Sequence, residues 1–234
     1  MKLSKILAPL LALCLFASTA CASTFIDAHG NEIQLDDSLE AYAAVTLVGA
    51  NDAARQGETN LGDLWTDALR WFAVSGEINA AFDEDDVKAG NDHIAVDADH
   101  VVALWNGGNL RADIAEGTFG AEALAEVLPF PNKVAVVYMS GAQLLEALEA
   151  ASQALPYTAE TADACASLMQ VSGLTYTVDT AKAYDALEAY GDHWFTAGSV
   201  SRVSISDVNG QPFDETATYA VVTSNANFNG MDSS

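Results

Sequence analysis

The chain has 234 residues, of which 50% are hydrophobic, and its 33 acidic residues against 9 basic ones give a formal net charge of −24. The hydrophobic content excludes a disordered chain, and the length is enough for one domain with its own core. The acidic field disfavours nucleic-acid backbones and anionic membranes as partners, and it is typical of a solvated surface that keeps an exported protein soluble.

Residues 1–22 have the pattern of a secretory signal peptide. A basic start and an apolar run too short to span a bilayer precede the small-residue site Ala20-Cys21-Ala22. We therefore predict cleavage after Ala22 and a secreted or periplasmic protein. The alternative is a lipoprotein acylated at Cys21, which is disfavoured because Ser18 stands where a lipobox has a large aliphatic residue. No later segment is predicted to span a membrane.

The first half of the mature chain is predicted to contain a hairpin, a strand and a long helix. Thr24 to Leu35 alternates around a turn, so residues 23–40 are expected to form a hairpin and linker before a single domain over residues 41–234. Val45 to Val48 is a candidate strand. Apolar residues at helical spacing predict a helix that begins at Thr59 or Asn60 and closes near Gly76. Arg70 lies beyond these apolar positions and is predicted to be solvated. Residues 79–99 are polar and acid-rich and are predicted to form a loop.

The second half is predicted to mix strands with helices. The candidate strands are His100 to Trp105, a buried Val134 to Met139, Leu174 to Val178 and Val200 to Ile205. One helix is expected from Gly120 to Leu128, and another after the capping box Ser140-Gly141-Ala142-Gln143. Asn209-Gly210 is predicted to turn a hairpin into Thr218 to Thr223. Without a regular βαβ repeat, this pattern favours an α+β fold, with a mixed sheet and packed helices.

A short loop after the strand at residues 100–105, together with a ring one helix later, carries the candidate binding residues. Asparagine and arginine side chains can hydrogen-bond a sugar or phosphate oxygen, glycines let the backbone approach a ligand, and a ring behind a proline offers a stacking face. These candidates are Asn106, Gly107, Gly108, Arg111 and Phe130. The alternatives left open are a simple turn at the Asn-Gly pair, core packing of the ring, and pairing of Arg111 with Asp113 or Glu116.

Four blocks of sequence, in order, resemble the C-terminal domain of the 5'-nucleotidase family, which includes UDP-sugar hydrolases and 2',3'-cyclic phosphodiesterases. The blocks are residues 55–64 with Asp67-Ala68, residues 106–111, Val127-Leu128-Pro129-Phe130 running into Ser140-Gly141, and residues 170–174. A fifth, Thr218-Tyr219-Ala220-Val221, leads to an altered ending. The resemblance implies a 5'-nucleotidase C-terminal type of fold and a place in nucleotide catabolism within a hydrolase family.

The resemblance also implies roles for individual residues, because in that family this domain grips the nucleoside part of the substrate. Arg55 matches an arginine that contacts substrate, Asn106 and Arg111 match the binding loop, and Phe130 matches one of two rings that sandwich the base. Asp232 matches an aspartate that holds the ribose hydroxyls. The second ring falls at Ala226, with Phe228 the nearest aromatic residue, and the closing motif reads Gly230-Met231-Asp232-Ser233. An incomplete C-terminal end of the domain is one interpretation. Glu58, Thr59 and Asp67 are expected to hold the helix start and its packing rather than to contact a ligand.

Catalytic motifs are missing from the chain. Asp27-Ala28-His29 resembles the first metallophosphatase motif, and Gly90-Asn91-Asp92-His93 contains the residues of the second in a different order. Because motif matches need their structural context, we interpret the two segments as a hairpin turn and a polar loop. Cys165 would remain after signal cleavage, so no disulfide framework is expected. We predict no catalytic residue, no metal site and no cofactor in this chain, since the family's divalent metals bind in the N-terminal domain.

Three functional hypotheses remain open. The first is a domain that binds a nucleoside or nucleotide without hydrolysing it. The second is part of a split or truncated 5'-nucleotidase, acting with a separate metallophosphatase chain. The third is a structural or interaction module that has lost its ligand.

Overall fold

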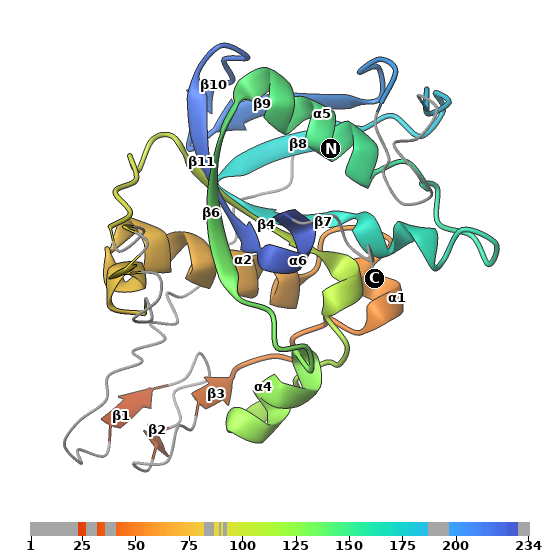
Figure 1. Ribbon diagram of the computed structural model, residues 1–234. Coiled ribbons are helices and arrows are strands. Elements are labelled where there is room, and N and C mark those ends of the chain that lie inside the picture. The colour runs from red at the N-terminus through yellow and green to blue at the C-terminus, as the bar shows by residue number, and fades with distance from the viewer. Residues whose placement is uncertain are drawn as a thin grey trace.

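The computed structural model describes residues 23–26, 32–35, 41–81, 87–88, 90, 93–186 and 197–228 (Figure 1). The predicted signal peptide at residues 1–22, the mimic of the first metal motif around His29 and the predicted ribose ligand Asp232 lie outside the described residues. Within the described residues, no helix combines the length and the apolar character that crossing a bilayer requires.

A four-stranded mixed sheet lies at the centre of the fold, in the order β6-β11-β4-β7. Its strands are β6 (Val134–Ser140), β11 (Thr218–Ser224), β4 (Val101–Asn106) and β7 (Met169–Ser172). Strand β11 runs parallel to β4 and antiparallel to β6, and β4 runs antiparallel to β7. The predicted α+β fold with a mixed sheet is therefore confirmed.

A second, antiparallel sheet has the order β10-β9-β8 and consists of β8 (Leu174–Val178), β9 (Val203–Val208) and β10 (Gln211–Pro212). Gly173 alone separates β7 from β8, so the chain changes sheets at this residue. Its φ of +81° suits glycine, and a Cβ here would lie 2.8 Å from the Val101 carbonyl oxygen. A side chain at this position would therefore disturb the junction of the two sheets.

The two faces of the central sheet are covered by different layers (Figure 1). Residues Val101, Ala103 and Trp105 of β4 face a core cluster with helix α2 (Asn60–Val74), which includes Leu61 and Leu69. The alternate β4 residues belong to a second core cluster, shared with helix α5 (Gly141–Ala151) and the second sheet. This alternation follows from the two-residue period of a strand. It explains why every residue of β4 is buried.

Shorter elements complete the described part of the fold. They are the pair β1 (Ser23–Ile26) and β2 (Glu32–Leu35), the pair β3 (Ala41–Ala43) and β5 (Gly117–Phe119), the helices α1 (Asn51–Ala54), α4 (Ala121–Val127) and α6 (Asn225–Phe228), and the 3-10 turns η1 (Glu77–Ala80), η2 (Gly107–Asn109) and η3 (Ala164–Ser167).

Several predicted elements are confirmed with their end signals. Thr59 caps α2, because its hydroxyl accepts a hydrogen bond from the Gly62 N–H at 3.1 Å, and Gly76 follows the helix in the left-handed conformation. The box at Ser140 and Gln143 caps α5 with both reciprocal hydrogen bonds. The hairpin β1–β2, the strand β4 and the helix α4 before Pro129 also form as expected.

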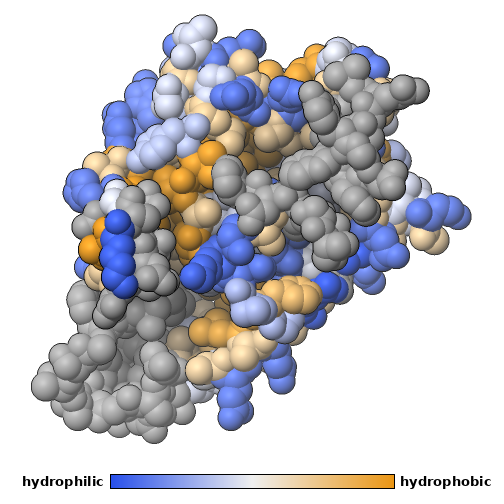
Figure 2. Space-filling view, viewed as in Figure 1, coloured by the Kyte–Doolittle hydropathy of each residue, from blue (hydrophilic) through white to orange (hydrophobic). Residues whose placement is uncertain are grey.

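Four predictions of local structure are wrong. Val45 to Val48 is not a strand; only Leu47 forms an isolated bridge, with Ile114. Strand β6 is not buried, because it lies at the sheet edge, where Tyr138 is 56% exposed; Figure 2 shows apolar surface along this strand. The Asn209-Gly210 turn leads only into β10, while β11 joins the other sheet. Arg70 is not solvated: its guanidinium donates to two backbone carbonyls before and within β4.

Candidate functional site

Asn106 ends β4 and begins the predicted binding loop, but its side chain is buried. The amide nitrogen donates to the Ala166 carbonyl oxygen at 3.2 Å, and the amide oxygen accepts from the Asn109 side chain at 2.6 Å. Both ends of the amide are thus bonded within the protein. In this structure Asn106 fixes the shape of the loop.

The glycine pair is explained by close packing of backbone. A Cβ at Gly107 would overlap the Ala54 carbonyl oxygen at the end of α1, and one at Gly108 would lie 2.5 Å from the Ala166 Cβ in η3. Because real Cβ atoms do not approach so closely, these positions require glycine. The pair allows the loop to pack between α1 and η3, and this packing does not depend on a ligand.

Arg55 lies just after α1, on the same side of the loop. Its guanidinium Nη1 donates to the Ala162 carbonyl oxygen at 2.9 Å and to the Asp163 carboxylate at 3.3 Å, and its side chain is 11% exposed. Its Nε is buried and has no hydrogen-bond partner in the described part of the chain. The structure brings Arg55 and Asn106 to the same packing unit, which α1, η2 and η3 form together.

Arg111 differs from the other arginines of the chain. Three guanidinium groups donate to backbone carbonyls, those of Arg55, Arg70 and Arg202. The guanidinium of Arg111 forms no hydrogen bond or ion pair with any described residue, and the pairing with Asp113 or Glu116 is not observed. The Asp113 carboxylate instead accepts the N–H groups at positions 49 and 50.

The guanidinium of Arg111 lies over the ring of Phe130, with its Cζ 5.0 Å from the ring centroid. This is the distance of a cation–π contact. Phe130 is 43% exposed, so it is a surface ring rather than a core residue. The Arg111 backbone N–H donates to the Val127 carbonyl oxygen at 2.9 Å, which fixes Arg111 to the end of α4, three residues before Phe130. Cation and ring are therefore presented jointly to solvent.

The described C-terminal segment lies beside the loop that carries Phe130. The Lys133 N–H donates to the Asn225 side-chain oxygen at 2.7 Å, and the Asn225 N–H donates to the Lys133 carbonyl oxygen at 2.8 Å. This pair fixes α6, on which Ala226 occupies the position of the second ring expected from the family. The side chain of Phe228 is not among the described ones.

A match over most of the chain decides the family. Residues 38–234 match the family described as the 5'-nucleotidase, C-terminal domain. This chain belongs to that family. It is 28% identical over 153 residues to the trifunctional nucleotide phosphoesterase protein YfkN of Bacillus subtilis, covering 65% of this chain and 9% of the relative.

A solved structure supports the same assignment. The 5'-nucleotidase precursor from Thermus thermophilus is 31% identical, with a TM-score of 0.55 over 82% of this chain and 30% of the solved one. The chain therefore spans under a third of this structure and about a tenth of the curated relative. The recognition of the family from its sequence blocks is confirmed.

A buried glutamine that sequence reasoning did not single out organises this 5'-nucleotidase C-terminal domain. The Gln170 side chain on β7 accepts from the Thr59 N–H at 2.9 Å and donates to the carbonyl oxygens of Ala54 at 3.0 Å and Gly57 at 2.9 Å. It thus links the sheet to α1 and to the start of α2. The only sequence signal for Gln170 was its place in one of the blocks that resemble the family. Its burial was not expected, because polar residues are rare at such buried positions.

Two acidic residues of α2, Asp63 and Asp67, lie near the hydrogen bonds of Gln170. Asp67 accepts a hydrogen bond from the Ser172 hydroxyl, which confirms its expected structural role. Burial, followed by the charge of Glu58 and a hydrogen bond with it, raises the pKa of Asp63 to about 7. The Asp63 carboxyl therefore retains its proton up to near-neutral pH.

The family's metal ions bind in its N-terminal domain. In the part of this chain that the structure describes, no group of three or more histidine, cysteine or acidic side chains is arranged to hold a metal ion. What the described site offers is recognition chemistry: an exposed ring with a cation over its face.

Proposed function

We propose that this domain binds a nucleoside or nucleotide at the surface formed by Arg111 and Phe130, as the substrate-recognition part of nucleotide catabolism. The observation that carries the proposal is the guanidinium over an exposed ring, at 5.0 Å, in a chain with a net charge of −24. In such an acidic protein, a cation that forms no ion pair with the described carboxylates is well placed to meet an anionic ligand.

The two side chains supply complementary interactions. Phe130 offers its exposed surface to a planar base, and stacking of this kind contributes about 0.5–1.5 kcal/mol beyond burial. Arg111 carries five N–H donors that match phosphate and ribose oxygens, and a charged hydrogen bond contributes about 1.5–3 kcal/mol. Set against the costs of ordering the ligand, these terms predict a dissociation constant from micromolar to millimolar.

Arg55 and Asn106, which the family also implies, can bind the ligand only if they give up their present hydrogen bonds. Arg55 and Asn106 would have to exchange their present bonds to Ala162, Asp163 and Ala166 for bonds to the ligand. Their contribution is therefore smaller than that of Arg111, or it is limited to holding the loop. Asp232 is proposed to hold the ribose, from the match to the family alone.

The alternative is that this domain is part of a split or truncated 5'-nucleotidase and that a separate metallophosphatase chain hydrolyses the substrate. The length of a relative is compatible with a recognition part within a larger enzyme, since the matched region is 30% of the Thermus thermophilus 5'-nucleotidase precursor. The packing roles of Asn106, Gly107 and Gly108 favour the third hypothesis, a structural module without ligand.

The pattern of residues 1–22 supports export to the periplasm or medium by cleavage after Ala22, rather than lipoprotein anchoring at Cys21.

A thermal-shift screen tests the proposal. Nucleosides, nucleoside monophosphates and UDP-sugars are added to the purified mature chain, because a ligand that binds only the folded state raises its melting temperature. We expect a shift with at least one monophosphate and no release of phosphate from it, with or without manganese. No shift with any compound would support the structural module, and metal-dependent release that survives repurification would show a catalytic centre in this chain.

A further inference from the structure

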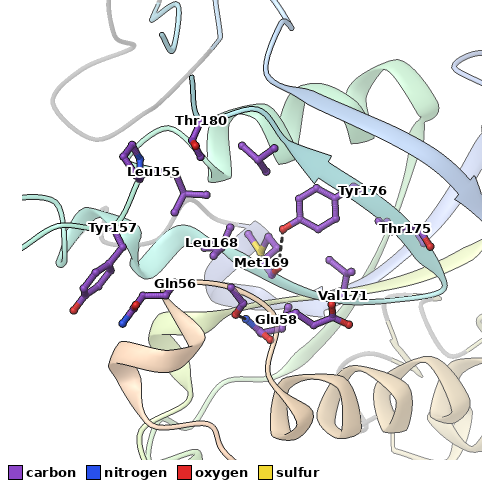
Figure 3. Close-up of a pocket in the computed structure, with 15 residues that line it drawn as sticks. Gln56, Glu58, Leu155, Tyr157, Leu168, Met169, Val171, Thr175, Tyr176 and Thr180 are labelled. Carbon is purple, nitrogen blue, oxygen red and sulfur yellow. Dashed lines mark hydrogen bonds between the residues drawn. The ribbon is translucent and has the colours of Figure 1, made fainter. Parts of the chain in front are cut away.

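A cavity of about 470 Å³ is bordered by the loop between α1 and α2 (Figure 3). It opens between that loop, the turn after α5, and strands β7 and β8. None of the described residues that line it belongs to the predicted nucleotide site. Its volume is in the range of small-molecule sites in proteins.

The floor of the cavity is apolar, and its single formal charge is negative. Leu155, Leu168, Met169 and Val171 supply apolar surface, and Glu58 supplies a carboxylate. Lysine, arginine and histidine do not occur among the described residues of the lining. Figure 3 shows Glu58 on the loop below the cavity and Tyr176 on the strand above it.

Both tyrosines of the lining already donate their hydroxyl protons within the protein. The Tyr176 hydroxyl donates to the Met169 carbonyl oxygen at 2.9 Å, and the Tyr157 hydroxyl donates to the Asp52 carboxylate at 3.0 Å. Burial first, and the Glu58 charge second, raise the pKa of Tyr176, so its proton remains bound at neutral pH. A phenol that donates its one proton can still accept through its oxygen lone pairs.

The remaining polar side chains of the lining, Gln56, Thr175 and Thr180, can each donate and accept, so the charge of Glu58 decides which ligand the lining favours. The Gln170 amide, which also borders the cavity, is occupied on both sides by Thr59, Ala54 and Gly57. An anionic ligand would be repelled by Glu58, whereas an N–H-bearing cation would find a carboxylate and phenol oxygens above an apolar floor.

We propose that this cavity binds a small organic amine in its protonated form, with the ammonium group at Glu58 and Tyr176 and an apolar body on the leucine and methionine floor. The site is independent of the proposed nucleotide function. Aromatic faces and a carboxylate recognise such cations together, through cation–π attraction and charged hydrogen bonds.

The test is a calorimetric titration of the mature chain with phenethylammonium at physiological salt, beside its uncharged counterpart 2-phenylethanol. The site variant is Glu58→Gln, and the control is Glu122→Gln on α4, which removes the same charge from another exposed residue. Loss of a charged hydrogen bond predicts affinity about ten-fold lower or more for Glu58→Gln, with Glu122→Gln unchanged. The alcohol should bind at least about ten-fold more weakly than the amine.

Three results would overturn the proposal: no binding of the amine at millimolar concentration, equal affinity for amine and alcohol, or equal losses in the two glutamate variants. The last would show a general attraction of cations to an acidic surface. Arg111→Ala should leave amine affinity unchanged, so failure of the nucleotide proposal and failure of this one are distinguishable.

Discussion

Replacing Gln170 by alanine should destabilise the domain more than any other single change to an uncharged polar side chain discussed above. The substitution removes an acceptor for the Thr59 N–H and the donor to the Ala54 and Gly57 carbonyl oxygens, at bond lengths of 2.9, 3.0 and 2.9 Å. Each buried polar group left unpaired costs about 1–3 kcal/mol. Because water can reach part of this region through the neighbouring cavity, we expect a total of about 3–4 kcal/mol. That is a large fraction of a domain's usual stability of about 5–15 kcal/mol.

Urea unfolding followed by circular dichroism measures this loss. The matched control is Gln143→Ala, which removes the side-chain oxygen that accepts two exposed hydrogen bonds from Ser140 in the capping box of α5, and it should cost about 1 kcal/mol of unfolding free energy. Gln170→Met keeps most of the volume without the hydrogen bonds, and it should cost nearly as much as the alanine variant. If Gln170→Ala costs no more than Gln143→Ala, the amide does not link the sheet to α1 and α2 as described.

Three further predictions concern stability. The folded pKa of Asp63, about 7, lies above its ordinary value of 3.8, so the unfolded chain ionises this carboxyl first and stability falls as pH rises between these two values. Asp63→Asn removes this loss, so its stability relative to wild type should rise over the same range, by about 1 kcal/mol after solvent screening. A stability difference that does not change with pH would contradict the raised pKa of Asp63. Gly173→Ala should lower the free energy of unfolding in urea by about 2 kcal/mol, because the φ of +81° and the nearby Val101 carbonyl oxygen disfavour a Cβ. An unchanged free energy of unfolding would contradict the tight junction between the two sheets. Arg70→Ala should lower the free energy of unfolding by about 1–3 kcal/mol, because it removes two hydrogen bonds to backbone carbonyls. If Arg70 were solvated, its replacement would leave that free energy unchanged.

Local signals were sufficient to predict the elements whose pattern and end caps agree. The helix α2 has apolar residues at helical spacing, Thr59 at its start and Gly76 after its end, and all three features occur in the structure. Strand β4 was recognisable as a continuous apolar run because both of its faces are covered. Such features depend mainly on neighbours in sequence.

Tertiary partners decided the remaining elements. The apolar residues of β6 predict burial, but its place at a sheet edge depends on pairing with β11. The partners of Arg70 are carbonyl groups at positions 98 and 101, which helix periodicity cannot reveal. Since Asn209-Gly210 fits either strand that follows it, the sequence could not decide between β10 and β11.

The candidate site divides in the same way. The resemblance to the family placed Arg111 and Phe130 in one site, and the structure brings their side chains together. The residue pattern could not show that the Asn106 amide turns inward to Ala166 or that Gly107 packs on Ala54, because these partners are distant in sequence. Gln170 was missed as a structural centre for the same reason.

The most direct test of the central claim is a calorimetric titration of wild type and Arg111→Ala with the monophosphate that gives the largest thermal shift. Removing a charged donor should lower affinity about ten- to a hundred-fold, which takes a weak interaction below detection. Lys182→Ala removes the same charge from an exposed side chain in the loop after β8 and should leave affinity unchanged. Loss of binding in Arg111→Ala alone is the predicted result. Equal affinity of wild type and Arg111→Ala would contradict the proposal that this surface binds nucleotide.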